Sequence, residues 1–272
     1  MMKDFSKTYT KDDILRQLRE MNAPQDKLVM LHSSLRAVGK VEGGGEGLLD
    51  ILTEYFTKEG GLLCIPTHTW HNLEKDITLD MKSDDTCLGA FSSVAIRDGR
   101  GYRTESPTHS VVIFGERKKA EEIARGEAFA KTPTAPETVY GKLFENSGFV
   151  LLVGVAQNRN TYLHTVDEML RIPNRMDDKV IQTTIKKENG EIIKRDLSLF
   201  LTDYTEDISD RFIKYDTPFR YHGCITDGFL GNAPCQLCDA RKMKEVVEEI
   251  YRNAKGDPLK TEQPIPQKYY VK

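Results

Sequence analysis

The residues best suited to acid–base chemistry are His164 and the two acids that follow it, Asp167 and Glu168. On a helix, spacings of three and four residues place side chains on one face, so either carboxylate could reach the imidazole ring. Imidazole accepts a proton near neutral pH, and a carboxylate at its other nitrogen fixes the tautomer and raises the basicity. An inert pair on a surface helix has the same spacing, so the spacing alone leaves both readings open.

The apolar segment at residues 149–155 is expected to position this histidine. It is a continuous apolar run of strand length, which is typical of a strand buried on both faces. The run breaks at Gly154, a polar loop follows, and a helix is expected around residues 164–171. Open α/β sheets bind ligands beyond the carboxyl ends of such strands. This placement favours a catalytic role for His164.

A second candidate site follows the strand expected at residues 27–31. The chain continues with His32, Ser33 and Ser34, and then with a glycine cluster at residues 43–47 that precedes a helix. This arrangement can bind an anion, because free backbone N–H groups and the helix dipole point at the ligand. The pattern matches neither a P-loop nor the dinucleotide fingerprint. A plain glycine-rich connection is the equally compatible alternative.

Thr69 and Trp70 follow another expected strand, at residues 62–65, and Trp70 is the only tryptophan. We interpret this segment as a cleft wall that supplies a stacking ring and hydroxyl groups. The spacing of His68 and His71 also invites a metal site, but no third ligand has a suitable spacing. We therefore expect no bound metal.

His109 precedes the strand expected at residues 110–114, and it is either a second acid–base group or a buried structural histidine. The cysteines are odd in number and scattered, which indicates a reducing compartment rather than a disulfide scaffold. We interpret the pair at spacing Cys-x-x-Cys, Cys235 and Cys238, and the nearby Cys224 as chemical bystanders. The five cysteines are Cys64, Cys87, Cys224, Cys235 and Cys238.

The bulk composition is that of a globular protein without an obvious polyelectrolyte or lipid partner. Of the 272 residues, 39% are hydrophobic and 30% are charged, and the net charge is −3. That charge gives no basis for binding nucleic acid or an anionic membrane. The apolar runs reach about eight residues, whereas a membrane helix needs roughly 20. The first residues lack the apolar core of a signal peptide, so we expect a cytoplasmic protein.

The alternation of strands and helices predicts an α/β fold with a mixed, largely parallel central sheet flanked by helices. We expect one domain over residues 1–272, with its core at about 10–176. Asn189-Gly190 predicts an antiparallel hairpin of 179–187 and 191–200 within a substrate-side insertion at 177–220. In the C-terminal region, 221–272, a helix is expected at 239–253. The tail from residue 256 is expected to be loosely ordered.

Four segments, in this order along the chain, resemble the aminoglycoside 3-N-acetyltransferase family, whose fold differs from that of the GNAT acetyltransferases. They are His-Ser-Ser-Leu-x-x-Val-Gly at 32–39, Pro-Thr-His-Thr at 66–69, Pro-Thr-His-Ser-Val at 107–111, and the segment from 151 to His164. The chain also looks like the acetyltransferase-like members found in Gram-positive prophages. The resemblance implies His164 with Asp167 or Glu168 as catalytic residues, and Trp70 and His109 at the substrate. It implies that acetyl-CoA contacts His32, Ser33, Ser34, Leu35, Arg36, Val38, Gly39, Thr69 and Ser110.

The chain departs from the family pattern at two of these segments. Ser106 stands where the family usually has histidine, and Asp167 stands where it usually has glutamate. The shorter carboxylate of Asp167 could still reach the ring, or Glu168 could replace it. The region between the catalytic helix and the C-terminus, which shapes the antibiotic cleft in such enzymes, is also divergent.

The resemblance implies acetyl transfer from acetyl-CoA to the 3-amino group of a 2-deoxystreptamine aminoglycoside, and hence antibiotic resistance. The amine would attack the thioester directly while His164 takes its proton, and the protein would form a homodimer. Thr69, Ser110 or backbone N–H groups would stabilise the oxyanion. The alternatives are transfer to another amino sugar or amine, a non-catalytic coenzyme A-binding module, and a zinc hydrolase that uses His68, His71 and a thiolate.

Overall fold

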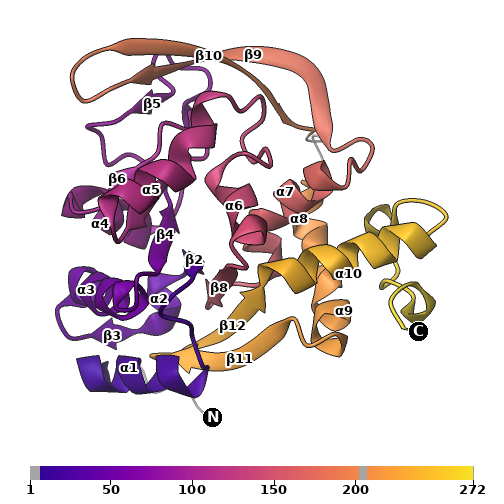
Figure 1. The fold of residues 1–272 in the computed structure, drawn as a ribbon, viewed down its shortest axis with the longest axis horizontal. Coiled ribbons are helices and arrows are strands. Elements are labelled where there is room, and N and C mark those ends of the chain that lie inside the picture. The colour runs from indigo at the N-terminus through magenta and orange to yellow at the C-terminus, as the bar shows by residue number, and fades with distance from the viewer. Residues whose placement is uncertain (1–6, 202–206, 272) are drawn as a thin grey trace.

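A computed structural model describes residues 7–201 and 207–271, and Figure 1 shows its fold. A mixed seven-stranded sheet forms the centre, in the order β11-β12-β8-β2-β4-β7-β6. These strands are β2 (Leu28–Ser33), β4 (Leu62–Pro66), β6 (Tyr102–Arg103), β7 (Val111–Phe114), β8 (Phe149–Val153), β11 (Ile225–Leu230) and β12 (Ala233–Asp239).

Parallel pairing is confined to the middle of this sheet. β2 pairs in parallel with β8 and with β4, whereas the four outer pairings are antiparallel. The mixed α/β class is therefore confirmed, but the sheet is less parallel than the sequence suggested. One reason is the hairpin β11–β12, whose two-residue turn at Gly231-Asn232 joins Leu230 to Ala233 and which adds two antiparallel strands beside β8. The other is that β7 runs antiparallel to both β4 and β6.

Helices cover both faces of the sheet because successive residues of each buried strand point to opposite faces. In β8, Val150 and Leu152 belong to one apolar core, and Leu151 and Val153 belong to the other. One face is covered by α1 (Lys11–Glu20), α3 (Gly44–Thr57) and α4 (Ala90–Asp98). The other is covered by α5 (Arg117–Ala124), α6 (Val139–Glu145), α7 (Tyr162–Met169), α9 (Asp216–Tyr221) and α10 (Ala240–Asn253).

Local sequence signals account for the ends of several helices. Thr10 and Asp13 form a reciprocal capping box at the start of α1, and Asp239 caps α10 by accepting a hydrogen bond from the Lys242 N–H. The apolar stripe of α10, which includes Met243 and Ile250, is buried as its spacing indicates. The remaining helices are α2 (Leu35–Val38), α8 (Ile208–Arg211) and six 3-10 turns at 70–72, 125–128, 157–159, 212–215, 258–260 and 267–269.

A long hairpin arches over one side of the molecule, at the top of Figure 1. It consists of β9 (Met176–Lys186) and β10 (Ile192–Phe200), with Ile192 opposite Lys186. β9 also pairs with the short β5 (Leu79–Asp80), and the small strands β1 (Thr8–Tyr9) and β3 (Lys40–Val41) pair elsewhere. The hairpin expected from Asn189-Gly190 is thus confirmed, and it ends at Phe200.

The expectation of a loosely ordered tail is wrong. Leu259, Ile265 and Tyr270 are buried in the same apolar core as α10. Asp257 forms an ion pair with Arg175, at 2.6 Å. Prolines and charges predicted disorder from composition, but these apolar side chains anchor the segment against α10, near the C label in Figure 1. Among the described residues, no helix combines the length and the apolar character that crossing a membrane requires.

Candidate functional site

A cavity of about 770 Å³ opens at the edge of the sheet where β2, β4 and β8 end. Its wall includes His32 from β2, His68 from the segment after β4, His109 from the segment before β7, and His164 from α7. The parallel strands end at a common edge, and β7 begins there because it runs antiparallel to β4. The sheet topology thus brings four separate histidine segments to one site.

The side-chain alternation of the strands explains why these rings meet on the face that α7 covers. Leu28 and Met30 of β2 belong to the core on that side, so His32, two residues further on, continues the same row. The rings of His68 and His109 lie 4.3 Å apart between centroids. The His68 Nε2 is 2.7 Å from the Tyr140 hydroxyl, and the His109 Nδ1 is 2.9 Å from the Thr108 hydroxyl.

His164 is held between aromatic rings at the cavity wall. Phe200, at the end of β10, stacks on the imidazole with centroids 4.0 Å apart and an interplanar angle of 16°. Phe212 meets the ring edge-on at 4.9 Å. Burial lowers the pKa of His164 from 6.5 to about 4, with Arg175 adding to the effect and Asp207 opposing it. The imidazole is therefore neutral at physiological pH and able to accept a proton.

The two acids after His164 make other contacts in this structure. Glu168 accepts hydrogen bonds from Thr132 and Thr134, at 2.5 and 2.8 Å. Asp167 accepts a bond from Arg175 with its Oδ2, at 2.6 Å, while its buried Oδ1 has no hydrogen-bond partner among the described residues. Of the two acids, only Asp167 thus keeps a free oxygen, one helical turn from His164.

The other three histidines are also neutral. Burial lowers the pKa of His32 to about 4 and that of His109 to about 3, and it lowers the pKa of His68 well below 6.5. The described residues contain no group of three or more His, Cys, Asp or Glu side chains arranged to hold a metal ion. The four histidines therefore place neutral imidazole rings around the cavity.

The end of β2 contributes to the wall of this cavity, and the segment after it leads away from the wall. His32 and Ser33 are still in the strand, and residues 35–38 form the short helix α2. The N–H of Ser34 donates to the carbonyl of Val153, which ties this segment to the end of β8. His32 and Ser33 line the cavity, whereas Ser34, Leu35, Arg36, Val38 and Gly39 are not part of its described wall.

Thr69 and Ser110 lie behind the wall rather than in it. The Thr69 hydroxyl donates to the carbonyl of Pro107, and the Ser110 hydroxyl donates to the carbonyl of Thr67. Both side chains are buried and hold the segment after β4 against the start of β7. In this structure neither hydroxyl is available to an oxyanion. Trp70 and His109, the residues expected at the substrate, do line the cavity.

No local sequence pattern predicts several residues of the cavity wall. Phe200 and Leu199 arrive from the hairpin β9–β10, and Asp207 arrives from the start of α8. Only tertiary packing brings them to His164. Asn160 and Arg159 precede α7 and were within reach of the sequence reasoning, because they follow the buried strand β8 directly.

The cysteines have no place in this chemistry. Cys235 and Cys238 lie on β12, where a spacing of three residues points the thiols into opposite cores. No described cysteine forms a disulfide. Cys87 lines the cavity, but its thiol donates to the carbonyl of His68, and burial raises its pKa.

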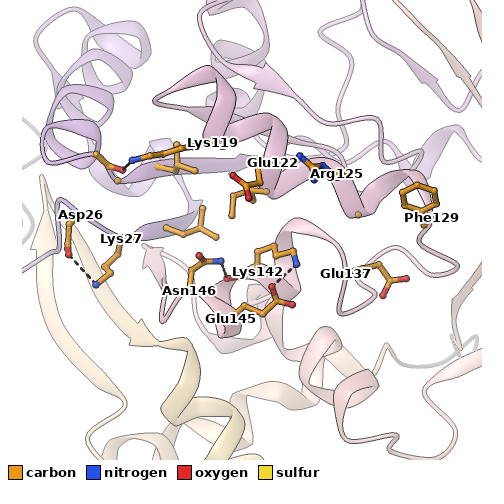
Figure 2. Close-up of a pocket in the computed structure, with 16 residues that line it drawn as sticks. Asp26, Lys27, Lys119, Glu122, Arg125, Phe129, Glu137, Lys142, Glu145 and Asn146 are labelled. Carbon is orange, nitrogen blue, oxygen red and sulfur yellow. Dashed lines mark hydrogen bonds and ion pairs between the residues drawn. The ribbon is translucent and has the colours of Figure 1, made fainter.

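A second cavity, of about 670 Å³, lies at the opposite end of the strands, where β2 and β4 begin. Figure 2 shows that charged side chains dominate it, among them Lys27 and Lys142. These pair with Asp26 at 3.1 Å and with Glu145 at 2.6 Å. This cavity has no histidine or thiol on its described wall, so the site for chemistry is the one at His164.

Comparison with known proteins gives a consistent result. A sequence model of the family described as aminoglycoside 3-N-acetyltransferase matches residues 30–252. Aminoglycoside N(3)-acetyltransferase IV of Salmonella sp is 25% identical, over 92% of this chain and 89% of that protein. The SPbeta prophage-derived aminoglycoside N(3')-acetyltransferase-like protein YokD of Bacillus subtilis (strain 168) is 24% identical, over 92% of this chain and 95% of that protein.

Solved structures of such enzymes share the fold. A variant of aminoglycoside acetyltransferase AAC(3)-IVa in complex with a gentamicin has a TM-score of 0.76 at 23% identity, over 93% of this chain and 91% of that one. The binary complex of AAC-IIIb with CoASH also has a TM-score of 0.76, at 20% identity, over 93% of this chain and 99% of that one.

Proposed function

The chain belongs to the aminoglycoside 3-N-acetyltransferase family of acetyl-CoA-dependent acyltransferases, and on that premise we propose that it acetylates an amine bound beside His164. The observation that carries the proposal is the neutral imidazole of His164 on the wall of a cavity of about 770 Å³. A base at that place can take the proton of an attacking amine. Ser33, at the end of β2, lies on the same wall.

The cavity wall suits the pantetheine arm of acetyl-CoA. Two buried polar atoms on this wall, the His32 Nε2 and the Asn160 Oδ1, have no hydrogen-bond partner among the described residues. Buried polar atoms are normally paired, so both are available to a ligand. Amide groups of a pantetheine arm would supply one acceptor and one donor. Leu31, Ile65 and Val155 would pack against its methylene groups.

The phosphate groups of the coenzyme would lie beside α2, next to the cavity wall. Among the described residues, the N–H groups of Leu35 and Arg36 have no hydrogen-bond acceptor, and the side chains of Arg36 and Arg159 are exposed. Backbone N–H groups and guanidinium groups are the usual partners of phosphate oxygens. The bound coenzyme supplies an acetyl thioester, which an uncharged amine can attack.

His164 would act as the general base. The amine nitrogen forms its bond to the acetyl carbon, and the carbon–sulfur bond breaks to release the coenzyme A thiolate. The proton that the nitrogen loses passes to the imidazole, which then gives it to that thiolate. The Asp167 Oδ1, free and one turn away, would accept a hydrogen bond from the ring and stabilise the imidazolium that forms. We do not assign this role to Glu168, because Thr132 and Thr134 occupy its carboxylate.

The amine that we propose as acceptor is the 3-amino group of a 2-deoxystreptamine aminoglycoside. The carboxylate of Asp207, on the cavity wall, would pair with another ammonium group of such a substrate. One observation favours a second candidate, a less highly charged amino sugar or amine. Within the described wall, Asp207 is the only carboxylate, and Trp70, Leu73 and Leu88 add apolar surface.

The test is to incubate the protein with acetyl-CoA and a panel of amines. The panel includes gentamicin, apramycin, amino sugars and simple amines, and the measurements are free thiol release and a mass gain of one acetyl group. Acetylation of the aminoglycosides supports the first candidate, and acetylation of other amines alone supports the second. If calorimetry shows that acetyl-CoA binds and no amine is acetylated, the enzymatic proposal is wrong and a binding module remains.

A further inference from the structure

Arg175 is the most heavily bonded buried cation that the structure describes. Its Nε donates to the Asp167 Oδ2 at 2.6 Å, and its Nη1 donates to the Asp257 Oδ2 at 2.6 Å. Its Nη2 donates to the Tyr251 hydroxyl at 2.6 Å and to the Asp257 Oδ1 at 3.2 Å. The Tyr251 hydroxyl in turn donates to the Asp257 Oδ1 at 2.8 Å. We call these four residues the Arg175 clamp.

The clamp joins two parts of the chain that are far apart in sequence, because Arg175 and Asp257 are separated by 82 residues. Asp167 lies on α7, three residues after His164, and Tyr251 lies near the end of α10. Asp257 belongs to the C-terminal segment and is fixed by the N–H of Leu259, which donates to its Oδ1. Leu259 is itself fully buried. The C-terminal segment is therefore linked to the catalytic helix by charge-assisted hydrogen bonds.

Burial distinguishes the clamp from the exposed ion pairs of the chain. The side chains of Arg175 and Asp167 are 3% and 2% exposed, whereas the Arg16–Glu20 pair is 55% and 61% exposed. Exposed pairs contribute little, but removing one partner of a buried pair leaves a charge without compensation. Burial raises the pKa of Asp167 to about 7, and the guanidinium of Arg175 opposes this rise. The Arg175 contact therefore favours the ionised carboxylate.

The two carboxylate oxygens of Asp167 have different environments. Arg175 occupies Oδ2, and Oδ1 is buried without a partner in the described part of the chain. We propose that Asp257 and Tyr251, through Arg175, are positioning residues that present the free Asp167 oxygen to His164. This rests on the proposed role of His164. The C-terminal segment thereby becomes part of the apparatus that orients the base.

The experiment uses the full chain and a readout that does not depend on turnover. Diethyl pyrocarbonate modifies neutral imidazole, and peptide mass mapping gives the rate at His164 with His71 as the internal reference. The variant Asp257→Asn keeps the shape and removes the charge. The control Glu262→Gln removes a carboxylate of the same segment that pairs with Arg211 and is 80% exposed. Melting temperatures are measured for every variant.

We expect Asp257→Asn to raise the relative modification rate of His164 severalfold, because the ring is no longer held. The kcat should fall about tenfold to a hundredfold while KM for acetyl-CoA changes less than about twofold. Arg175→Lys, which loses the planar fork, should act in the same direction. Glu262→Gln should change neither quantity. A milder variant, Tyr251→Phe, covers the case in which Asp257→Asn does not fold.

Unchanged His164 modification and an unchanged kcat in folded Asp257→Asn or Tyr251→Phe would overturn the positioning role. A lower melting temperature with unchanged kcat and modification rate would mean a structural role only, which also overturns it. If His164 modification rises but the wild-type protein acetylates no amine, the positioning holds and the proposed function fails. The two proposals are thus separated.

Discussion

Removing the Phe200 ring should return His164 toward ordinary titration. Phe200 stacks on the imidazole at 4.0 Å and screens it from water, and burial is the largest cause of the lowered His164 pKa. In Phe200→Ala, water reaches the ring, the charged form is better solvated, and the pKa rises from about 4 toward 6.5. Phe212 still contacts the ring edge, so part of the burial remains in the variant.

The size of the effect on activity follows from the neutral fraction of the base. At pH 5.5, an imidazole with a pKa of about 4 is about 97% neutral, and one with a pKa of about 6.5 is about 9% neutral. If His164 must be neutral to accept a proton, kcat/KM of Phe200→Ala at pH 5.5 should fall by up to about tenfold relative to wild type. At pH 8 both bases are neutral, and the two enzymes should differ much less.

The assay is the pH profile of kcat/KM from thiol release, between pH 5 and pH 9. The matched control is Phe229→Ala, which removes a half-exposed phenylalanine of β11 that is not on the cavity wall. The acid limb of the control should coincide with that of wild type. The reasoning is refuted if the acid limb of Phe200→Ala stays in place, or if it moves to lower pH.

Two further predictions concern the contact between α2 and the end of β8, and the burial of the cysteine thiols. Gly154 has φ +65°, and a Cβ there would lie 2.4 Å from the Ala37 Cβ. The variant Gly154→Ala should therefore push α2 away from the end of β8. We expect a lower melting temperature and, by calorimetry, weaker binding of acetyl-CoA. An unchanged affinity would show that α2 does not contribute to the coenzyme site. A thiol reagent should modify Cys87 first in the folded protein, because the other four thiols are buried. Bound acetyl-CoA should slow the modification of Cys87. Fast modification of Cys235 or Cys238 would contradict the burial of β12.

The sequence predicts those parts of the site that depend on patterns of neighbouring residues, such as an apolar run followed by a loop and a helix. The apolar run of β8 and the helix after it predict His164 beyond a strand end, and the strand before His32 predicts the same place for that residue. Carboxyl ends of parallel strands meet at one edge, so these segments converge whatever their distance in sequence. The hairpin β9–β10 was predictable because Asn-Gly strongly favours a tight turn.

The rest depends on contacts between distant residues that leave no local pattern. Nothing near Phe200 indicates that its ring covers His164, and nothing near Asp257 indicates a bond to Arg175, 82 residues away. β11 and β12 were missed because Gly231-Asn232 was not recognised as a hairpin turn. The three-residue spacing of His164 and Asp167 is visible in the sequence, but the ion pair between Arg175 and the Asp167 carboxylate is not.

The central claim is that His164 takes the proton from the attacking amine, and the variant His164→Ala tests it most directly. Its kcat and its calorimetric affinity for acetyl-CoA are measured side by side with those of wild type, on whichever amine the panel identifies. We expect kcat to fall by about 10² to 10⁴ while the affinity stays within about twofold. An unchanged kcat, with correctly folded protein, would contradict the account.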